Sequence, residues 1–96
     1  MQPVTFIGLD TDRLSSMLKA LSHPVRLEIV QLLSESGEAN CLDLTRHAGL
    51  AQSTISEHLR VLQQAGLIKQ CRPGARSGYC IQKDALVWLK QALVGL

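Results

Sequence analysis

The chain has 96 residues, a formal net charge of +2, and a hydrophobic content of 46% with only 3% aromatic residues. This length is enough for one domain, and an aliphatic core suits packed helices better than an aromatic-rich β-sandwich. We expect no membrane partner, because no apolar run approaches the roughly 18 residues of a membrane-spanning helix and residues 1–10 do not resemble an export signal. The protein is therefore expected to be soluble and cytoplasmic, with its three cysteines reduced.

Residues 1–10 lack periodicity and are predicted to form a flexible arm before a single domain over residues 11–96. A first helix is predicted by apolar residues at the spacing of one helical face: Leu14, Met17, Leu18 and Leu21. Pro24 suits the first position of a second helix, where its missing N–H would have no intrahelical partner in any case. We expect this second helix to end near Leu33, before a Ser- and Gly-containing segment over residues 34–37.

A helix-turn-helix is predicted in the middle of the chain. Asn40 is a good N-cap for a short helix over residues 41–48, and Asp43 lies in its first turn, where it meets the positive end of the helix dipole. Gly49 follows at a position that requires a left-handed turn. The chain then restarts as a helix over residues 53–65, whose inner stripe is Ile55, Leu59 and Leu62.

A β-hairpin and a last helix are predicted after this motif. Residues 67–71 and 78–82 have the composition of short strands and flank a Pro/Gly-rich turn. Asp84 is expected to cap a helix over residues 85–94, which has apolar residues nearly all the way round. Because so small a domain cannot bury both faces of that helix, a second copy of the chain is its natural cover. The predicted fold class is mainly α with a small β-hairpin, a winged helix-turn-helix.

The order of supporting helix, polar helix and basic hairpin predicts binding to double-stranded DNA. A major groove about 12 Å wide admits one helix, and an arginine-tipped hairpin can contact phosphates or the adjacent minor groove. Arg60 on the polar helix can pair with a phosphate or a guanine, and Arg72 and Arg76 would supply the hairpin contacts. The alternative is a solvated helix face and a solvated turn with no ligand.

Three segments at matching mutual distances resemble the ArsR/SmtB family of bacterial repressors: Leu21–Ile29, Gly49–Leu62 and Ala65–Ile68. The resemblance implies a winged-helix homodimer that leaves its operator DNA when a signal arrives. It implies that the recognition helix carries the DNA-binding residues Gln52, Ser53, Thr54, Ser56, Glu57, His58 and Arg60. The first and last helices would then pack across the two-fold axis through Leu14, Met17, Leu18, Leu86, Trp88, Leu89 and Leu93.

The start of the recognition helix departs from the family pattern. The family usually has serine where this chain has Ala51, and the loss of such an N-cap costs about 0.5–2 kcal/mol. Ser53 is an alternative cap, which would start the helix later and weaken the case for Gln52 as a base reader. His58 lies beside the apolar stripe, which favours packing or a backbone hydrogen bond over a base contact.

The metal-binding patterns of the family are not intact, so we expect no metal and no cofactor. Asn40 and Leu42 occupy the positions of a cysteine pair, with Cys41 between them, and one thiolate cannot supply three or four ligands. The last helix keeps Asp84 without a histidine. The histidines are expected to be scattered structural or surface residues: His23, His47 and His58.

The cysteines are the candidate redox sensor. Cys71 and Cys80 should lie at about the same level on opposite strands, where a disulfide is feasible if their Cβ atoms are roughly 3.5–4.5 Å apart. Arg72 would favour the reactive thiolate of Cys71, and Cys41 at a helix N-terminus is a second candidate. Thiol oxidation and a thiophilic metalloid both stay open as the signal, and the alternative is that the cysteines are small packing residues.

An enzyme is not expected, because no nucleophile lies with a base at a recognised motif spacing. The rival function is a protein-protein adaptor, since winged helices also bind proteins without reading DNA. Arg60, Arg72 and Arg76 would discriminate between the two. The repressor is favoured if these arginines lie on one face of a symmetric dimer at a spacing of roughly 34–36 Å. The adaptor is favoured if they are scattered or paired with Asp and Glu.

Overall fold

The computed structural model describes residues 10–72 and 78–96, so most of the predicted flexible arm lies outside the described residues. Asp10, the last residue of that arm, caps the first helix by accepting a hydrogen bond of 2.9 Å from the Arg13 N–H. The helices and strands follow the order α1 (Thr11–Leu21), α2 (Pro24–Ser36), β1 (Ala39–Asn40), α3 (Cys41–Ala48), α4 (Gln52–Gln64), β2 (Ile68–Arg72), β3 (Gly78–Ile81) and α5 (Lys83–Val94). None of these described helices is both long and apolar enough to cross a membrane.

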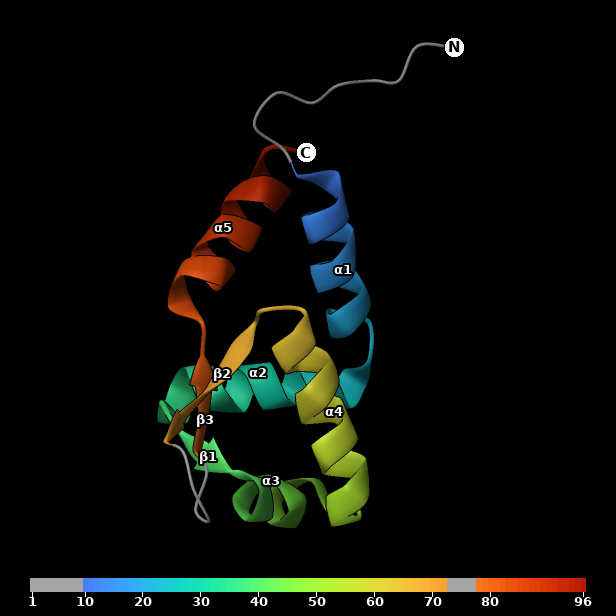
Figure 1. Cartoon of the computed structure of the whole chain (residues 1–96), viewed down its shortest axis with the longest axis vertical. Coiled ribbons are helices and arrows are strands. Elements are labelled where there is room, and N and C mark those ends of the chain that lie inside the picture. The colour runs from blue at the N-terminus through green and yellow to red at the C-terminus, as the bar shows by residue number, and fades with distance from the viewer. Residues whose placement is uncertain (1–9, 73–77) are drawn as a thin grey trace.

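The helices are arranged around a small antiparallel sheet with strand order β1-β3-β2. Figure 1 shows α1 and α5 together at one end of the molecule, near the C-terminus. The short helix α3 and the start of α4 lie at the opposite end, and α2 crosses between the two ends. This is the mainly helical winged helix-turn-helix that the sequence predicts, with β2 and β3 forming the hairpin, or wing.

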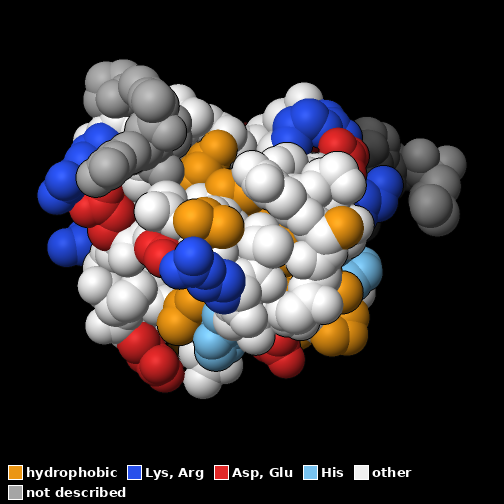
Figure 2. Space-filling model, turned by 90° about the horizontal axis from the view of Figure 1, so that it is seen from below, with side chains coloured by type: hydrophobic (Ala, Val, Ile, Leu, Met, Phe, Trp, Pro, Cys, Tyr) orange, Lys and Arg blue, Asp and Glu red, His pale blue; other side chains and the backbone are white. Residues whose placement is uncertain are grey.

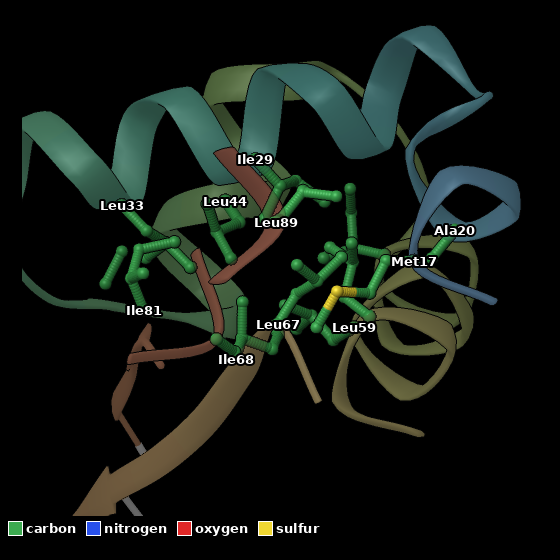
Figure 3. Packing of buried hydrophobic residues seen from close by; sticks show 14 of the residues in the cluster. Met17, Ala20, Ile29, Leu33, Leu44, Leu59, Leu67, Ile68, Ile81 and Leu89 are labelled. Carbon is green, nitrogen blue, oxygen red and sulfur yellow. The ribbon is translucent and has the colours of Figure 1, made fainter. Parts of the chain in front are cut away.

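The core is aliphatic and joins every helix to the sheet. Figure 3 shows side chains from α1, α2, α3, α4 and α5 meeting those of the strands. Ile55 and Leu62 of α4 have no exposed area, and Leu59 is 1% exposed, so the inner stripe predicted for this helix is confirmed. Complete burial of a side chain of this size contributes about 1.5–3 kcal/mol. The position of α4 is therefore fixed by its buried face.

Helix α2 ends three residues later than predicted, at Ser36 instead of Leu33. The two serines do not end the helix, because Ser34 Oγ donates to Val30 O at 2.8 Å and Ser36 Oγ to Leu32 O at 2.9 Å. The break comes at Gly37, whose φ of 85° lies in the region that favours glycine.

The helix-turn-helix has the predicted turn. Asn40 and Asp43 form a capping box at the start of α3, with Asn40 Oδ1 accepting from the Asp43 N–H at 2.7 Å. Gly49 closes α3 with a φ of 67°, in the left-handed conformation. Consequently only three residues separate α3 from α4, and the two helices form one compact unit.

Two predicted caps are wrong. Ser53 does not start the recognition helix, because α4 begins at Gln52 with Ala51 in the N-cap position and without a capping side chain. Similarly, α5 begins at Lys83 after Gln82, which places Asp84 in the first turn instead of at the cap. In both helices the buried stripe sets the starting point more strongly than a local hydrogen bond of about 1 kcal/mol does.

The strand β1 was not predicted. Ala39 pairs with Tyr79 and Asn40 with Gly78, which adds a third strand on the free edge of β3. Two residues are too few to show an alternating pattern. Their pairing nevertheless ties the wing to the start of α3.

The capping box gives a test of the fold. Replacement of Asn40 by Ala should lower the free energy of unfolding by about 1 kcal/mol, because the Asp43 N–H loses its acceptor. Replacement of Ser53 by Ala should change it by less than about 0.5 kcal/mol, because Ser53 is exposed and does not cap α4. Urea denaturation at one fixed protein concentration measures both. Equal losses in the two variants would contradict this account of how the two helices begin.

Candidate nucleic-acid interface

The outer face of α4 is polar and exposed. Ile55, His58, Leu59 and Leu62 point into the protein, and the opposite face carries the predicted readers Gln52, Ser53, Thr54, Ser56, Glu57 and Arg60, all of them exposed. Because α4 begins at Gln52, that residue joins the same exposed N-terminal turn as Ser53 and Thr54. The structure thus brings six of the predicted residues onto one helix face with the dimensions that a major groove accepts.

His58 does not belong to this face, and its placement among the DNA-binding residues was wrong. The side chain is 9% exposed, and its ring centroid lies 4.5 Å from that of His23. Its Nδ1 lies 3.3 Å from Nη1 of Arg26. Since a guanidinium can only donate, Nδ1 is the acceptor and carries no proton. His58 thus connects α4 to the start of α2.

The structure joins two of the histidines that we expected to be scattered. His23 Nδ1 accepts a hydrogen bond of 3.1 Å from the Val25 N–H at the start of α2, while Arg26 Nε donates to Ala20 O at 2.6 Å. Burial, then His23 and Arg26, lower the pKa of His58 below its ordinary value of 6.5. His58 is therefore held neutral in a small cluster of basic side chains. His47 is exposed on α3 and lies outside this cluster.

Both described arginines of the candidate interface are paired with carboxylates. Arg60 Nε donates to Glu57 Oε2 at 2.9 Å, and its Nη2 donates to Glu57 Oε1. Arg72 Nε lies 3.1 Å from Glu38 Oε1, and Arg76 lies outside the described residues. Pairing of these arginines with carboxylates of the same chain is what we expected of a protein-protein adaptor. Exposed pairs of this kind, however, are worth only about 0–1 kcal/mol, so they do not keep either arginine from a DNA ligand.

The basic side chains of this end of the molecule are spread out. Figure 2 shows the end with α3 and the start of α4, where the blue Lys and Arg groups stand apart and polar surface lies between them. This distribution agrees with the small net charge of +2. The face in Figure 2 therefore shows no broad basic patch among its described residues, and we expect polar contacts to contribute more of any DNA affinity.

Glu38 holds the base of the wing. Its side chain lies over Gly78, where a Cβ would come within 1.9 Å of Glu38 Oε1. The same oxygen pairs with Arg72. Sequence reasoning missed Glu38, because its role depends on β1 lying beside β3. A side chain at position 78 would have to displace the Glu38 carboxylate, whereas the backbone angles of Gly78 do not call for glycine.

We predicted that Cys71 and Cys80 lie at the same level on opposite strands. The two cysteines are neighbours, but they are not directly opposite each other. Cys80 faces Lys69 across the sheet, and Cys71 lies in an irregular step of the register between Gln70 and Arg72. Cys71 Sγ donates to Gly78 O at 3.5 Å. Burial, the adjacent Cys80 thiol and the Glu38 charge raise the pKa of Cys71 to about 11. The expected activation of Cys71 by Arg72 is therefore wrong, because the pKa of this thiol is raised and not lowered.

Both wing thiols line an open cavity of about 900 Å³ between the end of α2, the sheet and α5. Cys71 is exposed and Cys80 half-buried. Over residues 10–72 and 78–96, no three His, Cys, Asp or Glu side chains gather as a metal site would require. The cavity therefore provides two thiol ligands, those of Cys71 and Cys80.

Cys41 lies apart from the wing pair. Its Sγ is 3.5 Å from Oγ of Ser56, one of the exposed residues of α4. The side chain is half-buried and packs against the core. This position fits the alternative of a small packing residue, with one contact to the recognition helix that sequence reasoning did not predict.

The expected dimer residues divide into three groups: buried, half-buried and exposed. Leu14, Met17 and Leu89 are buried within the single chain, at 6%, 1% and 3% exposed, so they are core residues and cannot supply interface area. Leu86 and Trp88 are half-buried, and the Arg13 guanidinium lies 4.3 Å from the Trp88 ring. The apolar side chains that remain exposed on α1, α5 and the C-terminal end are Leu18, Val87, Leu93, Val94 and Leu96.

Comparison with known proteins agrees with this geometry. Residues 23–70 match the family described as bacterial regulatory protein, arsR family. The chain is 39% identical over 86 residues to the HTH-type transcriptional regulator YgaV of Escherichia coli (strain K12), covering 90% of this chain and 87% of that protein. It is 38% identical over 80 residues to the arsenical resistance operon repressor of Staphylococcus xylosus, covering 83% and 76% of the two chains. A homodimeric winged helix-turn-helix DNA-binding domain from Mycobacterium bovis matches with a TM-score of 0.72 and 28% identity, over 86% of this chain and 77% of that one.

The neutral state of His58 predicts a pH dependence of stability. A histidine with a lowered pKa in the folded state binds its proton more readily when unfolded, so stability should fall as the pH decreases through 6.5. The variant His58→Gln should lose this part of the pH dependence, whereas His47→Gln on the exposed face of α3 should keep it. Urea denaturation between about pH 5 and pH 7 measures the three proteins. If the free energy of unfolding depended on pH in the same way for wild type and His58→Gln, His58 would not be the histidine responsible.

Proposed function

The chain belongs to the arsR family of bacterial regulatory proteins, and from this membership we propose that it is a transcriptional repressor that binds operator DNA as a homodimer. The main support for this proposal is the exposed polar face of α4, the helix that follows the left-handed turn at Gly49 in the chain. Such a helix fits the major groove, with its N-terminal residues next to the base edges. Because operator DNA is in the cytoplasm, the proposal places the protein there as well.

The homodimer is supported by the apolar surface at the α1/α5 end. Val87 is 53% exposed on α5 and Val94 is 87% exposed, and Leu18 adds a third apolar side chain from α1. Exposed apolar groups gathered on the terminal helices are typical of a protein-protein contact. Two-fold pairing at this end would leave both copies of α4 free, at the opposite end of each chain, as a palindromic operator requires.

The signal that we propose acts on the wing thiols. Cys71 and Cys80 lie in one open cavity, next to the pair formed by Arg72 and Glu38. A reaction that joins the two sulfur atoms must pull Cys71 out of its contact with Gly78 O and disturb the strand that carries Arg72. The wing contact with DNA would then be lost, which releases the operator.

Of the two chemistries left open, a trivalent arsenical fits the thiols better than an oxidant does. The raised pKa of Cys71 lowers the fraction of this residue that is thiolate at neutral pH. Peroxide attack by Cys71 needs its thiolate. Arsenous acid instead forms two As–S bonds with neutral thiols, while two As–O bonds break and two water molecules leave, without any electron transfer. The arsenical resistance operon repressor among the relatives is consistent with this choice.

The proposed roles predict different effects of two basic residues. Arg72→Ala should weaken binding to all duplexes and reduce the slope of log K against log salt by about 1, because one phosphate contact is lost. Lys90→Ala, on the exposed surface of α5, should change neither quantity. Fluorescence anisotropy on DNA from upstream of its own gene and on a random duplex, at several salt concentrations, measures both. The adaptor would be favoured if wild type showed no preference for either duplex.

The thiol signal is tested on the same DNA complex. Arsenite should raise the dissociation constant at least about 10-fold for wild type and for Cys41→Ser, whereas Cys71→Ser and Cys80→Ser should not respond. Peroxide at the same concentration should act far more slowly, because the Cys71 pKa is raised. The proposed signal would be refuted if arsenite raised the dissociation constant of both wing variants as much as that of wild type. It would also be refuted if only Cys41→Ser failed to respond.

A further inference from the structure

The pairing between Glu57 and Arg60 on α4 suggests which base pair the helix reads. The two side chains lie on the exposed face, with 58% and 53% of their side-chain surface accessible, and the described contacts hold them only to each other. Each carboxylate oxygen accepts from a different nitrogen of the same edge of the guanidinium group, Nε and Nη2. Glu57 and Arg60 thus form a bidentate ion pair on the exposed face of α4.

This geometry leaves a defined part of Arg60 free. A guanidinium group is planar and carries five N–H donors. The bonds to Glu57 use the Nε–H and one Nη2–H, which leaves three donors. One Nη1–H and one Nη2–H of these lie side by side on the edge formed by Nη1 and Nη2, and the other Nη1–H points toward Cδ. Two parallel donors on one edge match O6 and N7 of guanine in the major groove. Helical side chains also lean toward the N-terminus of their helix, which brings the group back toward the polar first turn of α4.

A phosphate is a poorer ligand for this pair. Glu57 and Arg60 together carry no net charge, and phosphate contacts derive their affinity from positive charge. A carboxylate beside the phosphate would also repel it. Conversely, the outer lone pairs of Glu57 can accept from the N4 amino group of a cytosine. The charge of the pair therefore favours base edges over the backbone.

We propose that Glu57 and Arg60 act as one unit that reads a G·C base pair in each operator half-site, with Arg60 contacting guanine O6 and N7 and Glu57 holding the guanidinium group in the orientation that this contact needs. The inference rests on the proposed function, since it presupposes that α4 enters the major groove. It makes Glu57 a determinant of specificity and not of overall affinity.

The test combines protein variants with an altered base. Duplexes that wild type prefers are recovered from a random-sequence pool, and each guanine of a half-site is replaced in turn by 7-deazaguanine, which keeps base pairing but lacks the N7 acceptor. At one position the replacement should weaken wild-type binding about 10-fold. Arg60→Ala should lose less than about 2-fold at that same position.

Glu57 is tested with a charge-matched control. Glu57→Gln should bind random duplex at least as well as wild type, because a negative charge is gone, but should prefer guanine at the sensitive position far less strongly. Glu35→Gln, which removes an exposed carboxylate from α2 instead, should leave the preference unchanged. Both substitutions are at exposed positions, and circular dichroism verifies that the variants are folded.

The outcomes separate this inference from the function that it rests on. If wild type recovers no preferred duplex, the repressor proposal itself fails. If it recovers one, but no guanine position depends on both N7 and Arg60, the base-reading pair is refuted while the repressor stands. An equal loss by Arg60→Ala on every duplex would likewise refute it, by showing that Arg60 holds a phosphate.

Discussion

The burial of one face of α4 is the constraint on which the rest of the molecule depends. Ile55, Leu59 and Leu62 are almost completely inaccessible, so the rotation of the helix about its axis is fixed by the core. The opposite face must then be the polar one, and Gly49 turns the chain sharply enough for α3 to support it. His58 adds a polar contact to α2 without reaching the solvent. The reading surface thus follows from packing.

Charge at the interface is arranged in pairs and not in a patch. Arg60 and Arg72 each have a carboxylate partner, Glu57 and Glu38, at the two places where a winged helix meets DNA. Each pair leaves some N–H donors of its guanidinium group free for a ligand. At the base of the wing, one such pair is also next to Cys71 and Gly78. In the function that we propose, the thiol signal and the wing contact with DNA are therefore both located at the base of the wing.

Much of this could be predicted from sequence, because the decisive signals are local. The N-cap at Asn40 and the glycine turn at Gly49 are read from single residues and their neighbours, and the spacing of apolar residues gives the order of the elements. The failures involve contacts between distant segments. Glu38 acts on Arg72 only because β1 joins the sheet, and the register step at Cys71 depends on strand pairing that the composition does not encode. Likewise, Met17 lies in the core of one chain because α1 and α4 close over it.

The central claim is that two copies of α4 read one palindromic site. Hydroxyl-radical footprinting on DNA from upstream of the gene, with native mass spectrometry of the complex, tests it most directly. The account predicts two protein chains per duplex and two protected regions related by two-fold symmetry, with centres one helical turn apart, about 10–10.5 base pairs. One chain per duplex, or uniform protection that random DNA shows equally, would contradict it.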